Sequence, residues 1–234
     1  MAESVVHLQS GYVLQHRPYR ETSEIIDVLT RDFGRISILA KGGRKPGSNT
    51  AALLRPFLAL RVSYRGRTDL KTLTHVEPLE ASPPLQGLPL YCGFYLNELI
   101  CHFLHKSDPH PEVFQLYREC LLELSGNSEI ERILRIFELN LLINVGYGLQ
   151  LNFDSQNKKP VLPMKRYFYN ADSGPVEAED GDIAGQTLLA LYTRTFADSK
   201  TLGEVKKFMR TVIDFHLQGK PLKSRAVIAR ILKQ

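Results

Sequence analysis

The residues best suited to chemistry in this chain are the lysines and arginines of residues 31–71. This stretch holds ten of them against two acids, Asp32 and Asp69, which gives it a local charge of +8 in a chain of net charge +5. The ten are Arg31, Arg35, Lys41, Arg44, Lys45, Arg55, Arg61, Arg65, Arg67 and Lys71. They are interleaved with apolar residues in a strand-like alternation, so we expect a folded basic surface rather than a polar tail. Such a surface suits a polyanion, and single-stranded nucleic acid is the first candidate.

Within this stretch, the glycine-rich loop of residues 42–49 carries Arg44 and Lys45. It lacks the G-x-x-x-x-G-K-S/T order of a nucleotide-binding loop, so we expect it to grip a nucleic-acid backbone, with a plain solvated loop as the alternative. Tyr64 is the favoured base-stacking aromatic because it lies beside Arg65 and Arg67, although aromatic residues of small barrels more often fill the core. The predicted contacts are Arg31, Arg35, Lys41, Arg44, Lys45, Tyr64, Arg65, Arg67 and Lys71.

A second basic set lies near the C-terminus. Residues 201–234 have a net charge of +6, whereas residues 81–150 have −4, so two basic ends flank an acidic middle and suggest separate surfaces with separate partners. The second set comprises Lys206, Lys207, Arg210, Lys220, Lys223 and Arg225. A solvated face, a nucleic-acid site and a site for an acidic peptide all stay open for it.

Arg132 and Arg135 stand three residues apart in a predicted helix over residues 129–145. Arg135 can form ordinary surface ion pairs with Glu131 and Glu138. Alternatively, the two arginines can form a basic lip over an apolar groove that receives the acidic and hydrophobic tail of a partner.

Catalytic and metal-binding patterns are scarce. The chain has no G-x-S-x-G or H-E-x-x-H sequence, and its cysteines, Cys92, Cys101 and Cys120, form no C-x-x-C pair. We therefore expect no enzyme activity, no metal and no cofactor. Two other functions stay open. The chain could be a metal-dependent nuclease that uses Asp154, Asp180 and Asp182, or an adaptor whose basic faces bind only proteins. The sequence shows neither a secretion signal nor an apolar run that could span a membrane, so a cytoplasmic protein is expected.

The elements that must position these residues change along the chain. Five short runs with strand-like alternation, at residues 4–15, 24–31, 35–41, 55–65 and 69–77, predict an OB-type barrel over residues 1–80, with an SH3-like barrel as the rival. Prolines and a glycine mark residues 81–89 as a linker. Helical spacing then predicts a mainly α-helical domain over residues 90–234, interrupted by an irregular insertion at about residues 149–183. The fold class is therefore α+β with more than one domain.

An ordered set of short segments resembles the RecO family of bacterial recombination mediators. The segments are Arg17–Ser23, Thr30–Arg35, Ala40–Arg44, Arg65–Arg67, Lys71–Leu73, Tyr95–Leu99, Arg135 with Phe137–Leu139, Gly146–Gly148 and Gly219–Arg225. They span nearly the whole chain. Some members of that family carry a four-cysteine zinc module after the Gly-Tyr-Gly turn, but residues 149–163 contain no cysteine, so no zinc is expected here.

The resemblance implies an N-terminal OB domain and a C-terminal helical domain. It implies binding of single- and double-stranded DNA, annealing of complementary strands and cooperation with RecR. It also implies an interaction with the C-terminal tail of single-stranded DNA-binding protein, followed by loading of RecA. Arg132 and Arg135 are our candidates for contacts with that tail.

Overall fold

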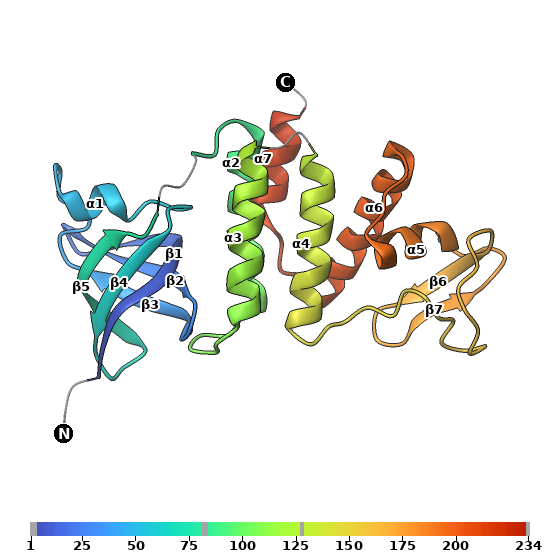
Figure 1. Cartoon of the computed structure of the whole chain (residues 1–234), viewed down its shortest axis with the longest axis horizontal. Coiled ribbons are helices and arrows are strands. Elements are labelled where there is room, and N and C mark those ends of the chain that lie inside the picture. Colours follow the sequence, from blue (N-terminus) through green and yellow to red (C-terminus); the bar gives the residue numbers. More distant parts are fainter. Residues whose placement is uncertain (1–3, 81–83, 127–128, 233–234) are drawn as a thin grey trace. The chain divides into compact units, whose positions relative to one another are not determined.

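The computed structural model describes residues 4–80, 84–126 and 129–232 of the chain (Figure 1). The chain forms two compact units, of which the first is Met1–Gly126 together with Leu222–Gln234 and the second is Asn127–Pro221. Residues 81–83, which are part of the predicted linker, lie outside the described residues. No helix in the described part of the chain is both long and apolar enough to cross a bilayer.

The first unit begins with a closed five-stranded barrel of order β1-β2-β3-β5-β4, as predicted for the N-terminal region. Its strands are β1 Val5–Tyr19, β2 Ser23–Thr30, β3 Gly34–Ala40, β4 Leu60–Arg65 and β5 Leu70–Pro78, and the short helix α1 Asn49–Leu53 joins β3 to β4. The neighbours pair antiparallel except β3 and β5, which pair parallel where the barrel closes. This confirms the OB-type prediction over the SH3-like rival.

Alternation along the strands builds the barrel core. Val28, Ile36, Ile38 and Val62 point inward and are at most 3% exposed. The intervening residues point outward, and this period of two is what the sequence pattern encodes.

A helical hairpin packs on the barrel within the same unit. It consists of α2 Leu88–Phe103 and α3 Pro111–Gly126. The amide of Asn97 donates to the Leu14 carbonyl oxygen at 2.8 Å, and the Tyr117 hydroxyl donates to the other end of that amide at 2.6 Å. Because both polar groups are buried and satisfied, they fix the hairpin against β1.

The last helix, α7 Lys223–Ile231, also belongs to the first unit. The Glu98 carboxylate of α2 accepts hydrogen bonds from the backbone amides of Lys223 at 2.8 Å and Ser224 at 2.9 Å. A carboxylate at a helix N-terminus satisfies free amides and favours the helix dipole. The helices α2, α3 and α7 thus cluster with the barrel in the first unit, and the domain bounds predicted from the sequence stay a prediction.

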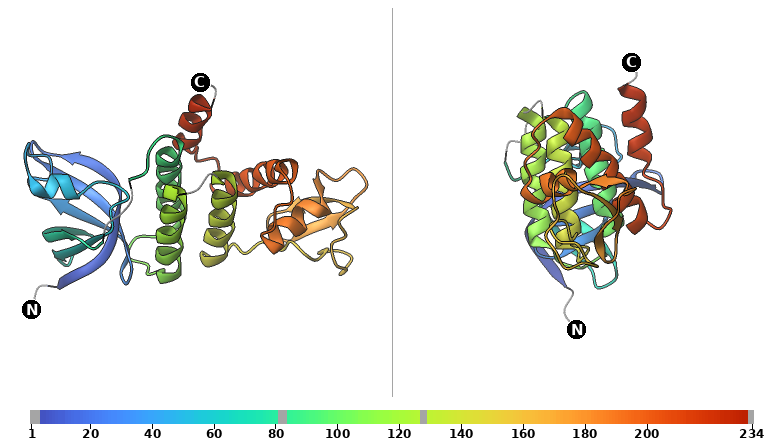
Figure 2. Two further views of the ribbon diagram at one scale, coloured as in Figure 1. Left: turned by 45° about the horizontal axis from the view of Figure 1, so that its top comes forward. Right: turned by 90° about the vertical axis from the view of Figure 1, so that its right-hand side faces the viewer.

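The second unit contains α4 Ile130–Asn144, α5 Gly185–Thr193 and α6 Ser199–His216, with a three-stranded sheet of order β7-β6-β8 (Figure 2). The strands are β6 Arg166–Asn170, β7 Gly174–Glu177 and β8 Ile183–Ala184. This sheet occupies much of the stretch that the sequence marked as irregular. Asp154 organises its approach, because its carboxylate accepts from the backbone amides of Gln156, Asn157 and Glu177 at 2.6 to 2.9 Å.

Candidate nucleic-acid interface

Lys41, Arg44 and Lys45 form the first cationic group of the barrel, here called the basic loop. All three are exposed on the connection from β3 to α1. The Arg44 backbone amide donates to the Thr22 carbonyl oxygen at 2.9 Å, which holds the loop against the turn between β1 and β2. Among the described residues no carboxylate forms an ion pair with these three side chains, so their charge is available to an anion.

The second cationic group lies at the opposite end of the strands and is here called the turn end. It consists of Arg31 on the β2–β3 turn with Arg65, Arg67 and Lys71 around the β4–β5 turn. The Arg31 guanidinium lies 3.6 Å from the exposed carboxylate of Asp32, and Lys71 donates to the Gly66 carbonyl oxygen at 3.3 Å. The first three are exposed and Lys71 is half-buried. Arg31 donates its backbone amide to the Ser10 carbonyl oxygen of β1, and Gly66 donates to the Ser4 carbonyl oxygen just before β1, so both turns border the beginning of that strand.

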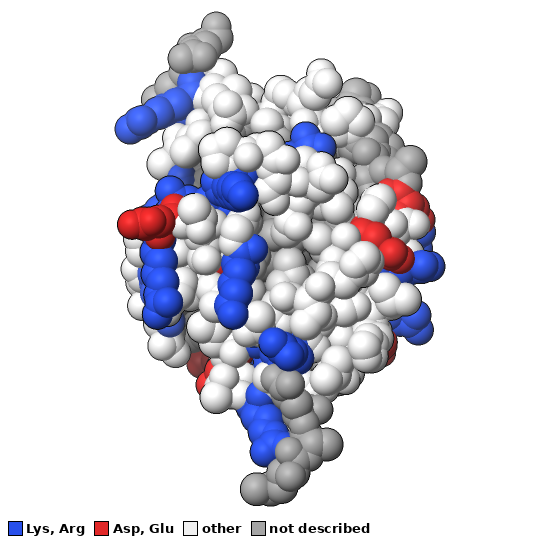
Figure 3. Space-filling view, turned by 90° about the vertical axis from the view of Figure 1, so that its left-hand side faces the viewer, with Lys and Arg blue, Asp and Glu red and all other residues white. Residues whose placement is uncertain are grey.

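The space-filling view of the barrel shows how these charges are distributed (Figure 3). Lys and Arg side chains outnumber carboxylates over the left half and the lower end of this surface, with carboxylates among them at the left edge and a further group on the right. A predominantly positive surface attracts a polyanion and weakens the repulsion between two polyanions that bind to it.

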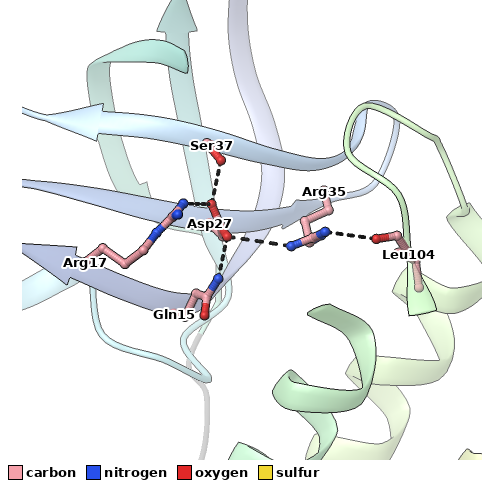
Figure 4. A network of polar contacts seen from close by, with 6 residues as sticks. All are labelled: Gln15, Arg17, Asp27, Arg35, Ser37 and Leu104. Carbon is pink, nitrogen blue, oxygen red and sulfur yellow. Dashed lines mark hydrogen bonds and ion pairs between the residues drawn. The ribbon is translucent and has the colours of Figure 1, made fainter. Parts of the chain in front are cut away.

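Arg35 does not belong to this surface, which corrects the prediction made for it. Its side chain is 13% exposed and lies 3.7 Å from a carboxylate oxygen of Asp27, while its guanidinium donates to the Leu104 carbonyl oxygen at 3.0 Å (Figure 4). It points outward from β3, as the alternation predicts, but the segment after α2 covers that face. Arg35 therefore ties the hairpin to the barrel and is not accessible to a phosphate.

Asp27 is the centre of this network (Figure 4). Its carboxylate accepts from the Ser37 hydroxyl at 2.6 Å, from the Gln15 amide at 2.5 Å and from the Arg17 guanidinium at 2.9 Å. Burial opposes ionisation of this group, but the hydrogen bonds and the charge of Arg17 outweigh it, so the pKa of Asp27 lies below its ordinary value.

Tyr64 is also corrected as a base-stacking residue. It is 3% exposed and packs in the barrel core, and burial raises the pKa of its hydroxyl to about 12. Its ring contacts that of Phe33, which is 41% exposed on the β2–β3 turn. The exposed aromatic ring at this end is thus a neighbour of the predicted one.

The second basic set is divided between the two units. Lys206, Lys207 and Arg210 on α6 and Lys220 after it belong to the second unit, whereas Lys223 and Arg225 belong to the first. Lys206 pairs with Glu131 at 2.6 Å, and Arg225 lies over the ring of Tyr95 at 5.8 Å. Arg210 lies 3.8 Å from Asp214, and Lys207 lines a cavity of about 530 Å³. A nucleic-acid role for these residues stays a prediction.

The two arginines of α4 have different environments. The Arg132 side chain is 43% exposed and lies 3.7 Å from Glu129. The Arg135 side chain is 6% exposed and pairs at 2.7 Å with Glu138, whose side chain is fully buried. Arg135 therefore cannot offer its charge to a partner's tail, which corrects the pairing of the two residues as one basic lip.

The acids of the nuclease alternative do not form a metal site. The Asp154 carboxylate is committed to three backbone amides and to the Asn157 side chain, whereas Asp180 and Asp182 are exposed. Within the described residues there is no group of three or more His, Cys, Asp or Glu side chains that could hold a metal ion.

Two cations that the sequence analysis did not select, Arg17 and Arg20, lie at the basic-loop end. Both are exposed, and the Arg44 guanidinium donates to the Arg20 carbonyl oxygen at 3.4 Å. Strands β1 and β3 run toward the same end of the barrel, so the loops that follow them are neighbours. In the predicted antiparallel barrel the first and third strands also run in one direction, and this was the signal that could have identified the two residues.

Comparison with known proteins agrees with this arrangement. A family model described as "Recombination protein O N terminal" matches residues 1–82, and one described as "Recombination protein O C terminal" matches residues 86–226. The chain is 44% identical to a protein named DNA repair protein RecO from Methylococcus capsulatus, over 95% of this chain and 93% of that protein. It is 40% identical to a protein of the same name from Nitrosococcus oceani, over 97% and 94% of the two chains. The chain therefore belongs to the recombination protein O family.

Proposed function

We infer that this chain acts in recombinational DNA repair as a DNA-binding mediator without catalytic chemistry. It binds single- and double-stranded DNA, anneals complementary single strands and helps RecA to load onto DNA coated by single-stranded DNA-binding protein. The observation that carries this proposal is the pair of exposed cationic groups at the two ends of the barrel, in a chain of the recombination protein O family.

Annealing by such a protein follows from electrostatics. Two single strands repel each other through their phosphates, and cations that bind both strands reduce this repulsion and raise the local strand concentration. No proton transfer or covalent intermediate is needed, so a surface without catalytic residues is sufficient.

The partner proteins follow from the same role. Recognition of the acidic C-terminal tail of single-stranded DNA-binding protein directs the mediator to covered DNA, and RecR acts with it. Because Arg135 is buried, Arg132 is the α4 cation that can meet a tail carboxylate. Arg132→Ala should weaken binding of an acidic and apolar tail peptide, whereas Arg210→Ala, which removes an exposed arginine of the same unit, should leave it unchanged. Equal affinity of the wild type, Arg132→Ala and Arg210→Ala for the peptide would exclude Arg132 as a contact of the tail.

The experiment that tests the proposal is a titration of labelled oligonucleotides followed by fluorescence anisotropy at several salt concentrations, combined with an annealing assay. We expect binding whose log affinity falls linearly with log salt, and faster pairing of complementary strands. An adaptor for proteins alone would not bind DNA. A nuclease would cleave the DNA when magnesium is added, and that activity would fall when Asp154, Asp180 and Asp182 are replaced.

A further inference from the structure

The face on which OB barrels commonly bind oligonucleotides is covered at its centre in the first unit. That face is formed by the second and third strands. Here the outward-pointing Asp27, Leu29 and Ser37 at the centre of the face are at most 4% exposed, whereas Ile25 and Leu39 nearer its edge are half-buried. The segment after α2 covers this centre, because Arg35 donates to the Leu104 carbonyl oxygen and accepts at its own carbonyl oxygen from the Ser107 amide at 2.9 Å. The centre of this face is therefore not open to a single strand, and other exposed surfaces of the barrel become the candidates.

The turn end offers an aromatic surface that is both exposed and held in place. The rings of Phe33 and Tyr64 meet edge to face, with centroids 6.2 Å apart and planes at 86°. Tyr64 is anchored in the core, so it restrains the Phe33 ring, which keeps 41% of its surface open. A restrained ring loses little conformational freedom when a base stacks on it.

Cations neighbour this aromatic pair along the chain. Arg31 precedes it on the same turn, and Arg65 with Arg67 comes from the neighbouring β4–β5 turn, which Phe33 reaches through Tyr64 at the end of β4. The exposed acids Asp32 and Asp69 stand on the same two turns, so the end is positive without being uniformly so. An aromatic platform flanked by cations is the arrangement that binds single strands without sequence preference.

We propose that Phe33 is a base-stacking residue for single-stranded nucleic acid and that Arg31, Arg65 and Arg67 hold the phosphates of the same strand. This inference rests on the proposed function and specifies where the barrel takes an unpaired strand. Stacking requires a base whose face is open, whereas bases inside a duplex are already stacked on each other. Phe33 therefore contributes to the binding of single strands and not to that of duplexes.

The chain contains no tryptophan, which gives a direct test. In Phe33→Trp the new indole is the one tryptophan in the protein, and we expect oligothymidylate to quench its fluorescence through stacking. The matched control is Phe94→Trp on α2, since Phe94 is 42% exposed and also packs edge to face on another aromatic ring. We expect no quenching of this control.

Affinity measurements complete the test. Phe33→Ala should weaken oligothymidylate binding about 5- to 150-fold, the range that stacking on one aromatic side chain provides, and should leave the affinity for a duplex of equal length unchanged. Phe33→Leu keeps an apolar contact with Tyr64 but cannot stack, so it should behave like Phe33→Ala. If Phe33→Ala does not fold, the fluorescence of Phe33→Trp decides the question.

The outcomes separate this inference from the proposed function. A wild-type protein that binds no oligonucleotide would refute the proposed function. A wild-type protein that binds, with no quenching in Phe33→Trp, or with equal quenching in both tryptophan variants, would refute only the role of Phe33. Equal losses for single strands and duplexes would also refute stacking.

Discussion

The basic loop allows a quantitative test of DNA binding. Replacing Lys41, Arg44 and Lys45 together by alanine removes three exposed charges and leaves intact the backbone hydrogen bond from Arg44 that positions the loop. If each side chain contacts one phosphate, the log–log salt slope for single strands should become less negative by about 2.1, at about 0.7 per contact. Extrapolated from about 1 M salt, this loss corresponds to about 100-fold weaker binding at 0.1 M and about 30-fold at 0.2 M. The assay is anisotropy of a labelled oligonucleotide across this salt range.

A matched variant separates local contact from overall charge. Replacing Lys158, Lys159 and Lys165 by alanine removes the same number of exposed charges from the second unit. We expect its salt slope to stay close to that of the wild type. Parallel salt dependences for the wild type and the basic-loop variant would refute the reasoning, because a loss that does not change with salt cannot come from phosphate contacts.

Three further predictions concern groups that the structure buries or constrains. Arg135→Ala removes the 2.7 Å ion pair with the fully buried Glu138 side chain, so it should cost about 3–5 kcal/mol of unfolding free energy, measured by urea denaturation. A loss under about 1 kcal/mol would contradict a buried pair. The pKa of Asp27 is lowered in the folded state, so its stabilisation is present above its unfolded pKa of about 3.9 and is lost as the pH falls through the folded value. The melting temperature of Asp27→Asn should therefore fall less than that of the wild type on acidification below about pH 5, and equal slopes would contradict this. Gly34 has a φ of +66°, and the Cβ added by Gly34→Ala would overlap the backbone of the α2–α3 loop, whereas the Cβ added by Gly42→Ala, at a φ of +70°, meets open space. Thermal denaturation should therefore show a larger fall in melting temperature for Gly34→Ala than for Gly42→Ala. Equal falls would contradict a costly overlap at Gly34.

The barrel was predictable because its information is local. The alternation from Glu24 to Thr30 and the turn that ends at Gly34 encode one antiparallel pair directly in the sequence. Residues of one strand also share a face by parity, and Tyr64 has the parity of Leu60 and Val62, which point into the core. The burial of Tyr64 could therefore have been predicted from the sequence, although the adjacent arginines favoured an exposed side chain.

Other properties depend on what covers a face, and no local pattern contains that information. Arg35 points outward, as the alternation predicts, but the backbone that covers it comes from Leu104, which is 69 residues away. Arg135 stands at a position where helical spacing alone predicts a surface ion pair, whereas the packing of the second unit buries it with Glu138. Both residues were predicted as binding residues because of their charge. In both cases, however, the guanidinium faces a buried carboxylate of the same unit.

The return of α7 to the first unit has a consequence for biosynthesis. The Glu98 carboxylate and the amide of Ser224 that it caps are separated by 126 residues, and the whole second unit is translated between them. During synthesis from the N-terminus, the surface of α2 that receives the final helix is made long before that helix, whereas all residues of the second unit are available earlier. A ribosome that stops before Lys223 would therefore release a chain whose later unit can be complete while its earlier one lacks its closing helix.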